Sequence, residues 1–254
     1  MAICKLCDRD RKLIDAHLIP RCMYDLEEKL PLAVVGIYSG DRPKRSQIGI
    51  YDQDILCAEC DGKLGVLDEY ACKVFDPEKL ELKVANATDG LAIDRDGTTF
   101  CYTIEGAQPE ILSKFVLSVL WRSHHSSREE AKVVRLGSHA DAIKSILLAD
   151  EPIANHIYSV HIEYNVDFKI TMLIGRHRPE GLVLNSFYTR NFGFHMKIDR
   201  QDHNEIFRLL CLAENRPVYA MAVNKLGTPF GRTVVSGLKR NFAKHGDPWK
   251  RRTS

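Results

Sequence analysis

The sequence contains no apolar run close to the roughly 18 residues that a helix needs to span a bilayer. Its first eight residues have no apolar stretch and no small-residue cleavage site, so we expect a cytoplasmic protein. A glycine-rich phosphate loop, a Rossmann fingerprint and a Gly-x-Ser-x-Gly elbow are also missing. These absences disfavour a kinase, a nicotinamide-dependent dehydrogenase and an α/β-hydrolase.

A large excess of charge is missing too, because 36 basic and 34 acidic side chains give a net charge of +2. The charge is nevertheless uneven, since residues 222–254 hold eight basic side chains and one acidic side chain. A basic tail suits contacts with nucleic-acid phosphates. The residues expected to make them are Lys239, Arg240, Lys250, Arg251 and Arg252. The alternative is a solvated terminus without such a role.

Cysteine is not scarce, and four of the eight cysteines form the Cys-x-x-Cys pairs Cys4/Cys7 and Cys57/Cys60. Each pair places two thiolates on one side of a tight turn, at a spacing that suits tetrahedral Zn²⁺. Together they complete a closed shell, so the sequence predicts a structural zinc site. The alternative is that one pair is coincidental or is a redox dithiol. The remaining cysteines are interpreted as buried small hydrophobic residues rather than disulfides, and are Cys22, Cys72, Cys101 and Cys211.

An amphipathic helix is predicted directly after the second cysteine pair. Its apolar face is formed by Cys60, Leu64, Leu67, Ala71 and Val74, which recur at helical spacing. A cysteine pair that opens into a helix, with a separate hairpin pair upstream, is the treble-clef arrangement. We therefore expect residues 1–76 to form a treble-clef zinc module.

One histidine, His17, stands between the two cysteine pairs and begins the short segment His17-Leu18-Ile19-Pro20. The series Cys4-x-x-Cys7, His17-Leu-Ile-Pro and Leu56-Cys57-x-x-Cys60-Asp61-x-Lys63 resembles the four-cysteine branch of the HNH, or His-Me finger, endonucleases. Members of that branch carry Asp-His or His-His before Ile-x-Pro, and Asn or His after the last cysteine. The resemblance implies a ββα-metal fold in which a histidine activates water beside one catalytic Mg²⁺ or Mn²⁺.

Carried over by position, the resemblance makes His17 the general base and Asp61 a ligand of the catalytic metal. Both roles suit the chemistry, because a neutral imidazole can accept a proton near pH 7 and a carboxylate is a hard oxygen donor. Ala16 departs from the family pattern, since it stands where the family has its first metal ligand and it cannot coordinate an ion. A replacement carboxylate could come from Asp15, Asp68 or Glu69. Otherwise the metal is held by fewer protein ligands and more water, or the site is degenerate.

The resemblance fades over residues 22–54, where a basic turn carries Arg42, Lys44 and Arg45. These side chains could contact a nucleic-acid backbone, or they could form a plain solvated loop. A second resemblance is to prophage-type bacterial HNH-like proteins, which share a segment like Phe115-x-x-Ser118-x-x-Trp121-Arg122. Serine often precedes the histidine in that group, so Ala16 would be typical of a subgroup.

Residues 77–254 are predicted to form an α+β domain with an antiparallel sheet. Alternation around Asp96-Gly97 indicates a hairpin, and the four segments between 157 and 198 read as a meander, with one further strand at 218–223. Helices are expected from Pro109 to Trp121, from a Ser138 cap through Leu148, and from Gly231 to Lys244.

The sequence thus predicts an HNH-like endonuclease that hydrolyses phosphodiester bonds. The resemblance to this family also suggests a role in phage defence. DNA is favoured over RNA as the partner, no membrane is expected, and a homo-oligomer or a regulatory protein partner is left open. The alternative is a non-catalytic treble clef that binds nucleic acid or protein, which Ala16 favours. A third interpretation places the chemistry of a zinc-stabilised enzyme in the C-terminal domain.

Overall fold

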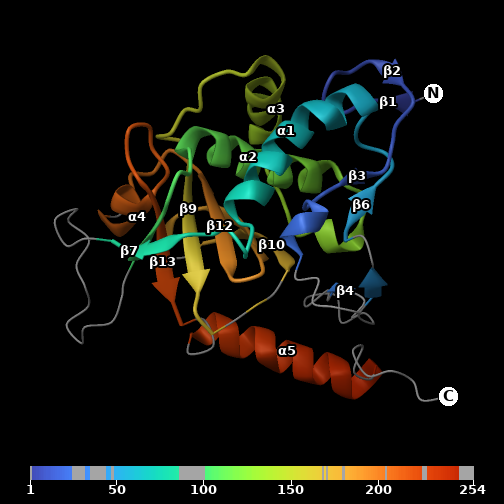
Figure 1. The fold of residues 1–254 in the computed structure, drawn as a ribbon. Coiled ribbons are helices and arrows are strands. Elements are labelled where there is room, and N and C mark those ends of the chain that lie inside the picture. Colours follow the sequence, from blue (N-terminus) through green and yellow to red (C-terminus); the bar gives the residue numbers. More distant parts are fainter. Residues whose placement is uncertain are drawn as a thin grey trace.

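The computed structural model describes residues 2–24, 32–34, 44–46, 49–85, 101–167, 169, 171–178, 181–203, 205–224 and 228–245. Its largest element is a seven-stranded sheet (Figure 1). The strands are β7 (Leu82–Val84), β8 (Cys101–Ile104), β9 (Tyr158–Asn165), β10 (Met172–His177), β11 (Leu184–Thr189), β12 (Phe192–Ile198) and β13 (Val218–Val223). Their order is β10-β11-β12-β9-β13-β8-β7, and only the β9–β13 pair within it is parallel.

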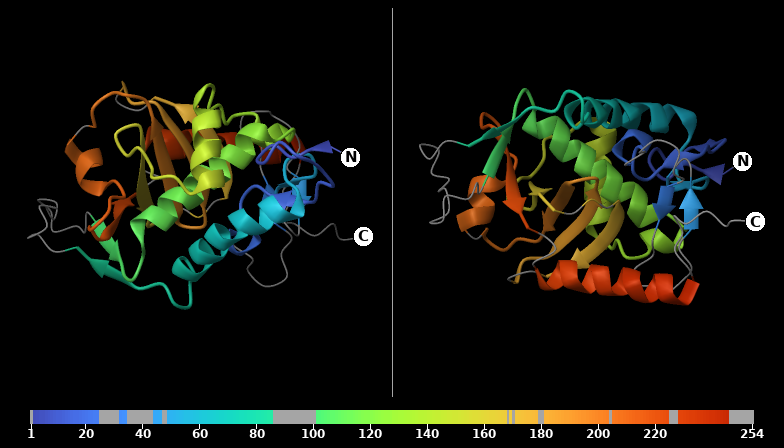
Figure 2. Two further views of the ribbon diagram at one scale, coloured as in Figure 1. Left: turned by 90° about the horizontal axis from the view of Figure 1, so that it is seen from above. Right: turned by 60° about the horizontal axis from the view of Figure 1, so that its bottom comes forward.

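Helix α2 (Pro109–His125) lies between this sheet and two further helices, α1 (Ala58–Val74) and α3 (His139–Ala149) (Figure 2). Pro109 suits the first helical position, because its missing N–H would have no partner there. The ring of Phe115 packs edge-on against Phe187 and Phe194 of the sheet. Every residue from Leu112 to Ser123 is buried, as expected for a helix covered on all sides.

The N-terminal part of the chain contains short two-stranded elements and α1. Strand β1 (Ala2–Ile3) pairs with β2 (Asp10–Arg11), and β3 (Ala16–His17) pairs with β6 (Tyr51–Asp52). A third pair joins β4 (Leu32–Val34) to β5 (Lys44–Ser46). The first two pairs lie beside the start of α1, so the elements that carry both cysteine pairs and His17 meet at one end of the molecule (Figure 1).

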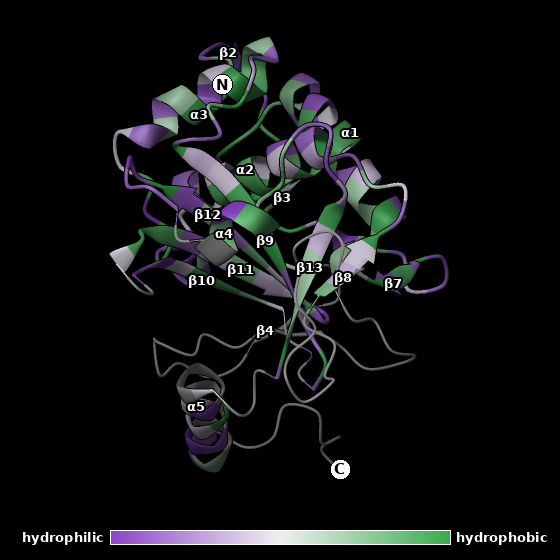
Figure 3. Ribbon diagram, turned by 90° about the vertical axis from the view of Figure 1, so that its left-hand side faces the viewer, coloured by the Kyte–Doolittle hydropathy of each residue, from purple (hydrophilic) through white to green (hydrophobic). Residues whose placement is uncertain are grey.

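Two helices complete the described fold. Helix α4 (Glu205–Leu210) contacts β9 and β13, and the ring of Phe207 meets the ring of His161 edge-on at 4.3 Å. The terminal helix α5 (Pro229–His245) lies apart from α1, α2 and α3 (Figure 3). Among the described helices, none is long and apolar enough to cross a bilayer.

One hydrophobic cluster runs from Cys4 in the N-terminal part to Ala220 in β13. Phe75, at the end of α1, reaches the sheet directly, with its ring centroid 4.7 Å from that of Phe192. Residues 1–76 and 77–254 therefore contribute to the same core.

The sequence-based element predictions are largely confirmed, with two corrections. The strands of 157–198 and 218–223 form, as do helices α2, α3 and α5. The sheet, however, is mixed rather than antiparallel, and β9 lies between β12 and β13 instead of beside β10. Strand β9 is the longest and almost wholly buried, so it takes a central place where both of its edges are paired. The hairpin predicted around Asp96-Gly97 lies outside the described residues.

The second correction concerns Ser138, which precedes α3 but makes no side-chain capping hydrogen bond. Its backbone is already helical, with φ −64° and ψ −12°, whereas a capping residue is extended. The helix itself forms over the predicted range.

The prediction for two of the cysteines was wrong, because Cys22 and Cys72 form a disulfide. It joins the 3₁₀ helix Arg21–Met23 to the last part of α1. A separation of 50 residues leaves no local pattern by which the sequence could have revealed this pairing. Cys101 is buried as predicted, whereas Cys211 is only half-buried.

Candidate metal centre and its surroundings

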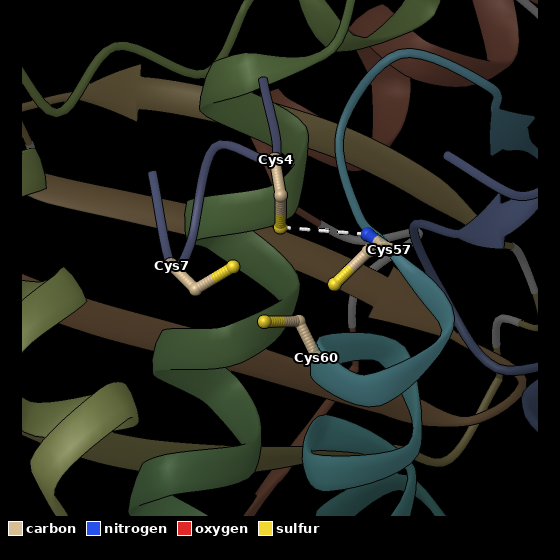
Figure 4. Close-up of side chains that lie close together, drawn as sticks. All are labelled: Cys4, Cys7, Cys57 and Cys60. Atoms are coloured by element: carbon tan, nitrogen blue, oxygen red, sulfur yellow. Dashed lines mark hydrogen bonds between the residues drawn. The ribbon is translucent and has the colours of Figure 1, made fainter. Parts of the chain in front are cut away.

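The four sulfur atoms of the two cysteine pairs lie within 4.8 Å of one another. Figure 4 shows them pointing toward a common centre, two from the turn between β1 and β2 and two from the start of α1. Cys4, Cys57 and Cys60 are buried and Cys7 is partly exposed. The predicted union of the two pairs is therefore confirmed as a buried cluster that could bind a metal such as zinc.

The local backbone explains how the first pair turns back on itself. Asp8 takes the left-handed conformation, with φ +56°, which aspartate tolerates better than most residues. The turn is closed by hydrogen bonds from Cys4 N to Arg9 O, at 3.0 Å, and from Asp8 N to Cys4 O, at 2.9 Å. Both cysteines of the pair thus face the same side.

Backbone contacts also join the first turn to the second cysteine pair. Lys5 N donates to Ile55 O at 2.8 Å, and Cys57 N donates to Cys4 Sγ at 3.4 Å. Cys57 is the N-cap residue of α1, so Cys60 falls in the first helical turn and points to the same side. The cluster therefore fixes the start of α1 against the β1–β2 hairpin.

The pKa values of two thiols of the cluster, Cys4 and Cys60, are shifted in opposite directions. Burial raises the pKa of Cys4, but hydrogen bonds from backbone amides, led by that of Cys7, outweigh it and lower the value to about 7. Burial and the neighbouring thiols raise the pKa of Cys60 well above its ordinary value. A bound divalent cation would instead favour the charged form of each thiol that it coordinates, since a coordinated thiol loses its proton. Four buried sulfur donors in a closed set are the ligands that structural Zn²⁺ takes.

The two residues expected to be catalytic are His17 and Asp61, and Asp61 directly follows Cys60 of the cluster. His17 is half-buried on β3, and its ring centroid is 6.4 Å from that of Tyr51. Asp61 is half-buried in the first turn of α1, where its backbone N donates to Cys57 O. Burial raises the pKa of Asp61, while the nearby charges of Arg122 and His17 act to lower it. The two side chains are thus close enough to interact electrostatically.

Arg122 is the residue that the sequence analysis did not single out here. Its side chain is 1% exposed, and its two terminal nitrogens bind both carboxylate oxygens of Asp68, at 2.8 and 2.7 Å. The same guanidinium donates to the backbone oxygen of His17 at 2.7 Å. Arg122 of α2 therefore ties β3 to α1, the helix that also carries Asp61. The available signal was an arginine directly after the apolar stripe of this helix, because a buried charge requires a partner.

The three carboxylates considered as substitutes for the missing ligand lie in different settings. Asp68 is bound by Arg122, so it serves that ion pair instead of standing free for a cation. Glu69 is exposed and pairs with Lys73 at 2.8 Å. Asp15 is exposed immediately before β3. Within the described residues, none of them joins His17 and Asp61 in a group of three ligand atoms within 4.8 Å.

Ala16 itself is fully buried and pairs across the strands with Asp52. The carboxylate of Asp52 is held by the hydroxyl of Ser126 at 2.7 Å and by the backbone N–H of Ser127 at 2.8 Å. The residue before His17 therefore has a buried apolar side chain that packs in the core and cannot bind a metal.

The predicted nucleic-acid contacts are only partly described. Lys239 and Arg240 are exposed on α5. Lys44 and Arg45 belong to β5. Arg42, Lys250, Arg251 and Arg252 lie outside the described residues.

Comparisons with known proteins assign no family or function to this site. No protein-family model matches the chain, and no match was found among curated proteins or solved structures.

Proposed function

We propose that the chain is a metal-dependent endonuclease of the HNH type, built on a treble-clef ββα module stabilised by zinc. In this proposal β3 and β6 are the two strands, α1 is the helix, and the four-cysteine cluster binds the structural Zn²⁺. The observation that supports it is electrostatic: His17 is near enough to act on the charge of Asp61, although the two residues are 44 positions apart in the sequence.

The proposed chemistry uses these two side chains in different ways. The imidazole of His17 would take a proton from the attacking water. Asp61 would hold one Mg²⁺ or Mn²⁺, which supplies stabilisation for charge on the phosphate oxygens. Arg122 would act as a positioning residue, since it grips the backbone of His17 and the helix that carries Asp61.

The decisive experiment is nicking of supercoiled plasmid by the zinc-loaded full chain with Mg²⁺ or Mn²⁺. We expect cleavage by the wild type and a loss of about 10²- to 10⁴-fold in His17→Ala, the range attributed to a general base. The matched control is His156→Ala, because His156 is exposed and lies outside the module. Equal cleavage by His17→Ala and wild type would refute the assignment, and the same assay on RNA distinguishes the two substrates.

A second candidate function is supported by one specific observation, the buried Ala16. A site that lacks its first metal ligand could retain the treble clef as a nucleic-acid-binding module without cleavage. That function predicts retention of DNA that weakens steeply with salt, and a smaller salt dependence in Lys239→Ala/Arg240→Ala. Retention without salt dependence would contradict it.

A further inference from the structure

The face of the large sheet opposite α2 carries a buried cluster of His161, Glu163 and His195. Their ligand atoms lie within 4.8 Å of one another, and the three residues are 8%, 8% and 3% exposed. The set consists of two imidazoles and one carboxylate, which together are common ligands of divalent transition metals. It lies on β9 and β12 and shares no residue with the four-cysteine cluster.

The strand register accounts for the convergence. His161 and His195 are direct cross-strand partners on β9 and β12, and Glu163 follows His161 by two positions on the same face. The neighbouring residues Ile162 and Phe194 point to the opposite face and into the core. The pattern His-x-Glu in an alternating strand was visible in the sequence, but the pairing that brings His195 beside it is non-local.

Burial and ring packing also suit a metal site. Glu163 is 8% exposed, and a buried carboxylate is a strong ligand for a cation. The rings of His161 and His195 are stacked with centroids 4.6 Å apart, so one ion could contact both imidazoles.

The imidazole of His195 is oriented by the next strand. Its Nδ1 lies 2.8 Å from the hydroxyl of Ser186 on β11. Its Nε2 lies 3.1 Å from Glu163 Oε2, but it makes no hydrogen bond of acceptable geometry among the described residues. Nδ1 contacts of this kind fix the orientation of metal-binding histidines and direct Nε2 to the ion.

Glu163 has an equivalent support in Tyr188, whose hydroxyl donates to Oε2 at 3.1 Å. The ring of Tyr188 can approach because its partner on β12 is Gly193. A Cβ on Gly193 would lie 2.5 Å from that ring and 2.9 Å from His195 Nε2. The absence of a side chain at Gly193 therefore preserves the arrangement of all three groups.

We propose that His161, Glu163 and His195 form a second metal centre that binds a divalent transition metal, with Zn²⁺ the best-suited ion. The ion would join β9 to β12 beneath Phe207 and leave one coordination position for water, because three protein ligands do not complete a tetrahedral shell. The centre is independent of the proposed nuclease function.

The test is metal content together with Co²⁺ substitution of the full chain. Purified wild type, saturated with Zn²⁺ and then desalted, should retain about two ions per chain, one for each cluster. His195→Ala and Glu163→Gln should each retain about one. With Co²⁺, the sulfur-to-metal charge-transfer bands of the cysteine site should persist in both variants, whereas the weaker bands of a nitrogen and oxygen site should disappear.

Two controls keep the result decisive. Glu163→Gln preserves side-chain size, and near-ultraviolet circular dichroism reports whether its fold is intact. His156→Ala removes an exposed histidine and should leave both ions bound. One ion per wild-type chain, held by sulfur alone, would overturn the proposal and favour an ion pair between Glu163 and a protonated His195. Unchanged metal content in both site variants would overturn it equally.

Discussion

Arg122 links the N-terminal part of the chain to α2 through a single buried side chain. Its buried guanidinium binds Asp68 on α1 and the backbone of His17 on β3. We expect Arg122→Met to lower the free energy of unfolding by about 3–5 kcal/mol, because Asp68 would keep a largely buried charge without its partner. Urea unfolding of the two proteins measures this difference.

The matched control for this prediction is Lys73→Ala. Lys73 pairs with Glu69, but both side chains are about two-thirds exposed. Exposed pairs contribute little because water screens them, so we expect almost no change in the free energy of unfolding. Similar losses in the two variants would show that the Arg122 pair is no stronger than a surface pair.

The buried carboxylate of Asp52 should make the stability of the protein depend on pH. Its pKa is lowered despite burial, because the hydroxyl of Ser126 and backbone and side-chain groups of Ser127 donate to the carboxylate. A folded-state pKa below the unfolded value of about 3.9 stabilises the protein above that pH, and this stabilisation disappears as the pH falls through the folded value.

Asp52→Asn should therefore lower the free energy of unfolding by about 1–3 kcal/mol at pH 6, where the charged acceptor is lost. Unfolding experiments from pH 6 down to pH 3 should show the gap from wild type narrowing below about pH 4. A gap that stays constant to pH 3 would contradict the assigned role. The exposed Asp10→Asn serves as the control, with an expected change below about 0.5 kcal/mol.

At the residue scale, the sequence was informative where chemistry is local. A Cys-x-x-Cys turn positions its own thiolates, so the cluster of Cys4, Cys7, Cys57 and Cys60 could be predicted from spacing alone. The Arg122–Asp68 pair spans 54 positions and forms only when α2 docks on α1, so nothing in the sequence near either residue specifies it.

At the scale of elements, the disulfide between Cys22 and Cys72 fastens α1 to the segment that follows β3. It closes a loop of 50 positions, which corresponds to about 4 kcal/mol of stabilisation in the chain-entropy model. Cys22→Ser/Cys72→Ser should therefore unfold at a lower urea concentration than the oxidised wild type. Alkylation of the denatured wild type should modify six cysteines before reduction and eight after it.

The control for the disulfide prediction is Cys211→Ser. Cys211 is a free, half-buried thiol, so its replacement should change the stability little. If the double variant were as stable as this control, or if all eight cysteines reacted before reduction, the disulfide would be absent in solution.

Strand and helix identities were accessible from periodicity, whereas their arrangement was not. The alternation of apolar and polar residues in β9 and β12 marks each of them as a strand with one face in the core. The parallel pairing of β9 with β13 depends on α4 and its connections, which return the chain to the same edge. Alternation describes a single strand and contains no information about its neighbours.

For the whole molecule, the continuous core predicts coupling between metal binding and global stability. The cluster that begins at Cys4 also contains Trp121 in α2 and Ala220 in β13. We expect a zinc chelator to lower the melting temperature by about 10 °C or more, in one transition seen alike by tryptophan fluorescence and far-ultraviolet circular dichroism. A zinc-sensitive transition that leaves the fluorescence of the buried Trp121 unchanged would instead identify residues 1–76 as an independent domain.

The contact of Arg122 with the His17 backbone also has a consequence for synthesis. The two residues are 105 positions apart, which at about 5–20 residues per second is a delay of roughly 5–20 s on the ribosome. All four thiols of the cysteine cluster emerge before Arg122 does. A metal ion bound by the nascent chain would therefore hold the start of α1 in place until Arg122 is synthesised. Arg122 can then bind the backbone of His17 and fix β3 against α1.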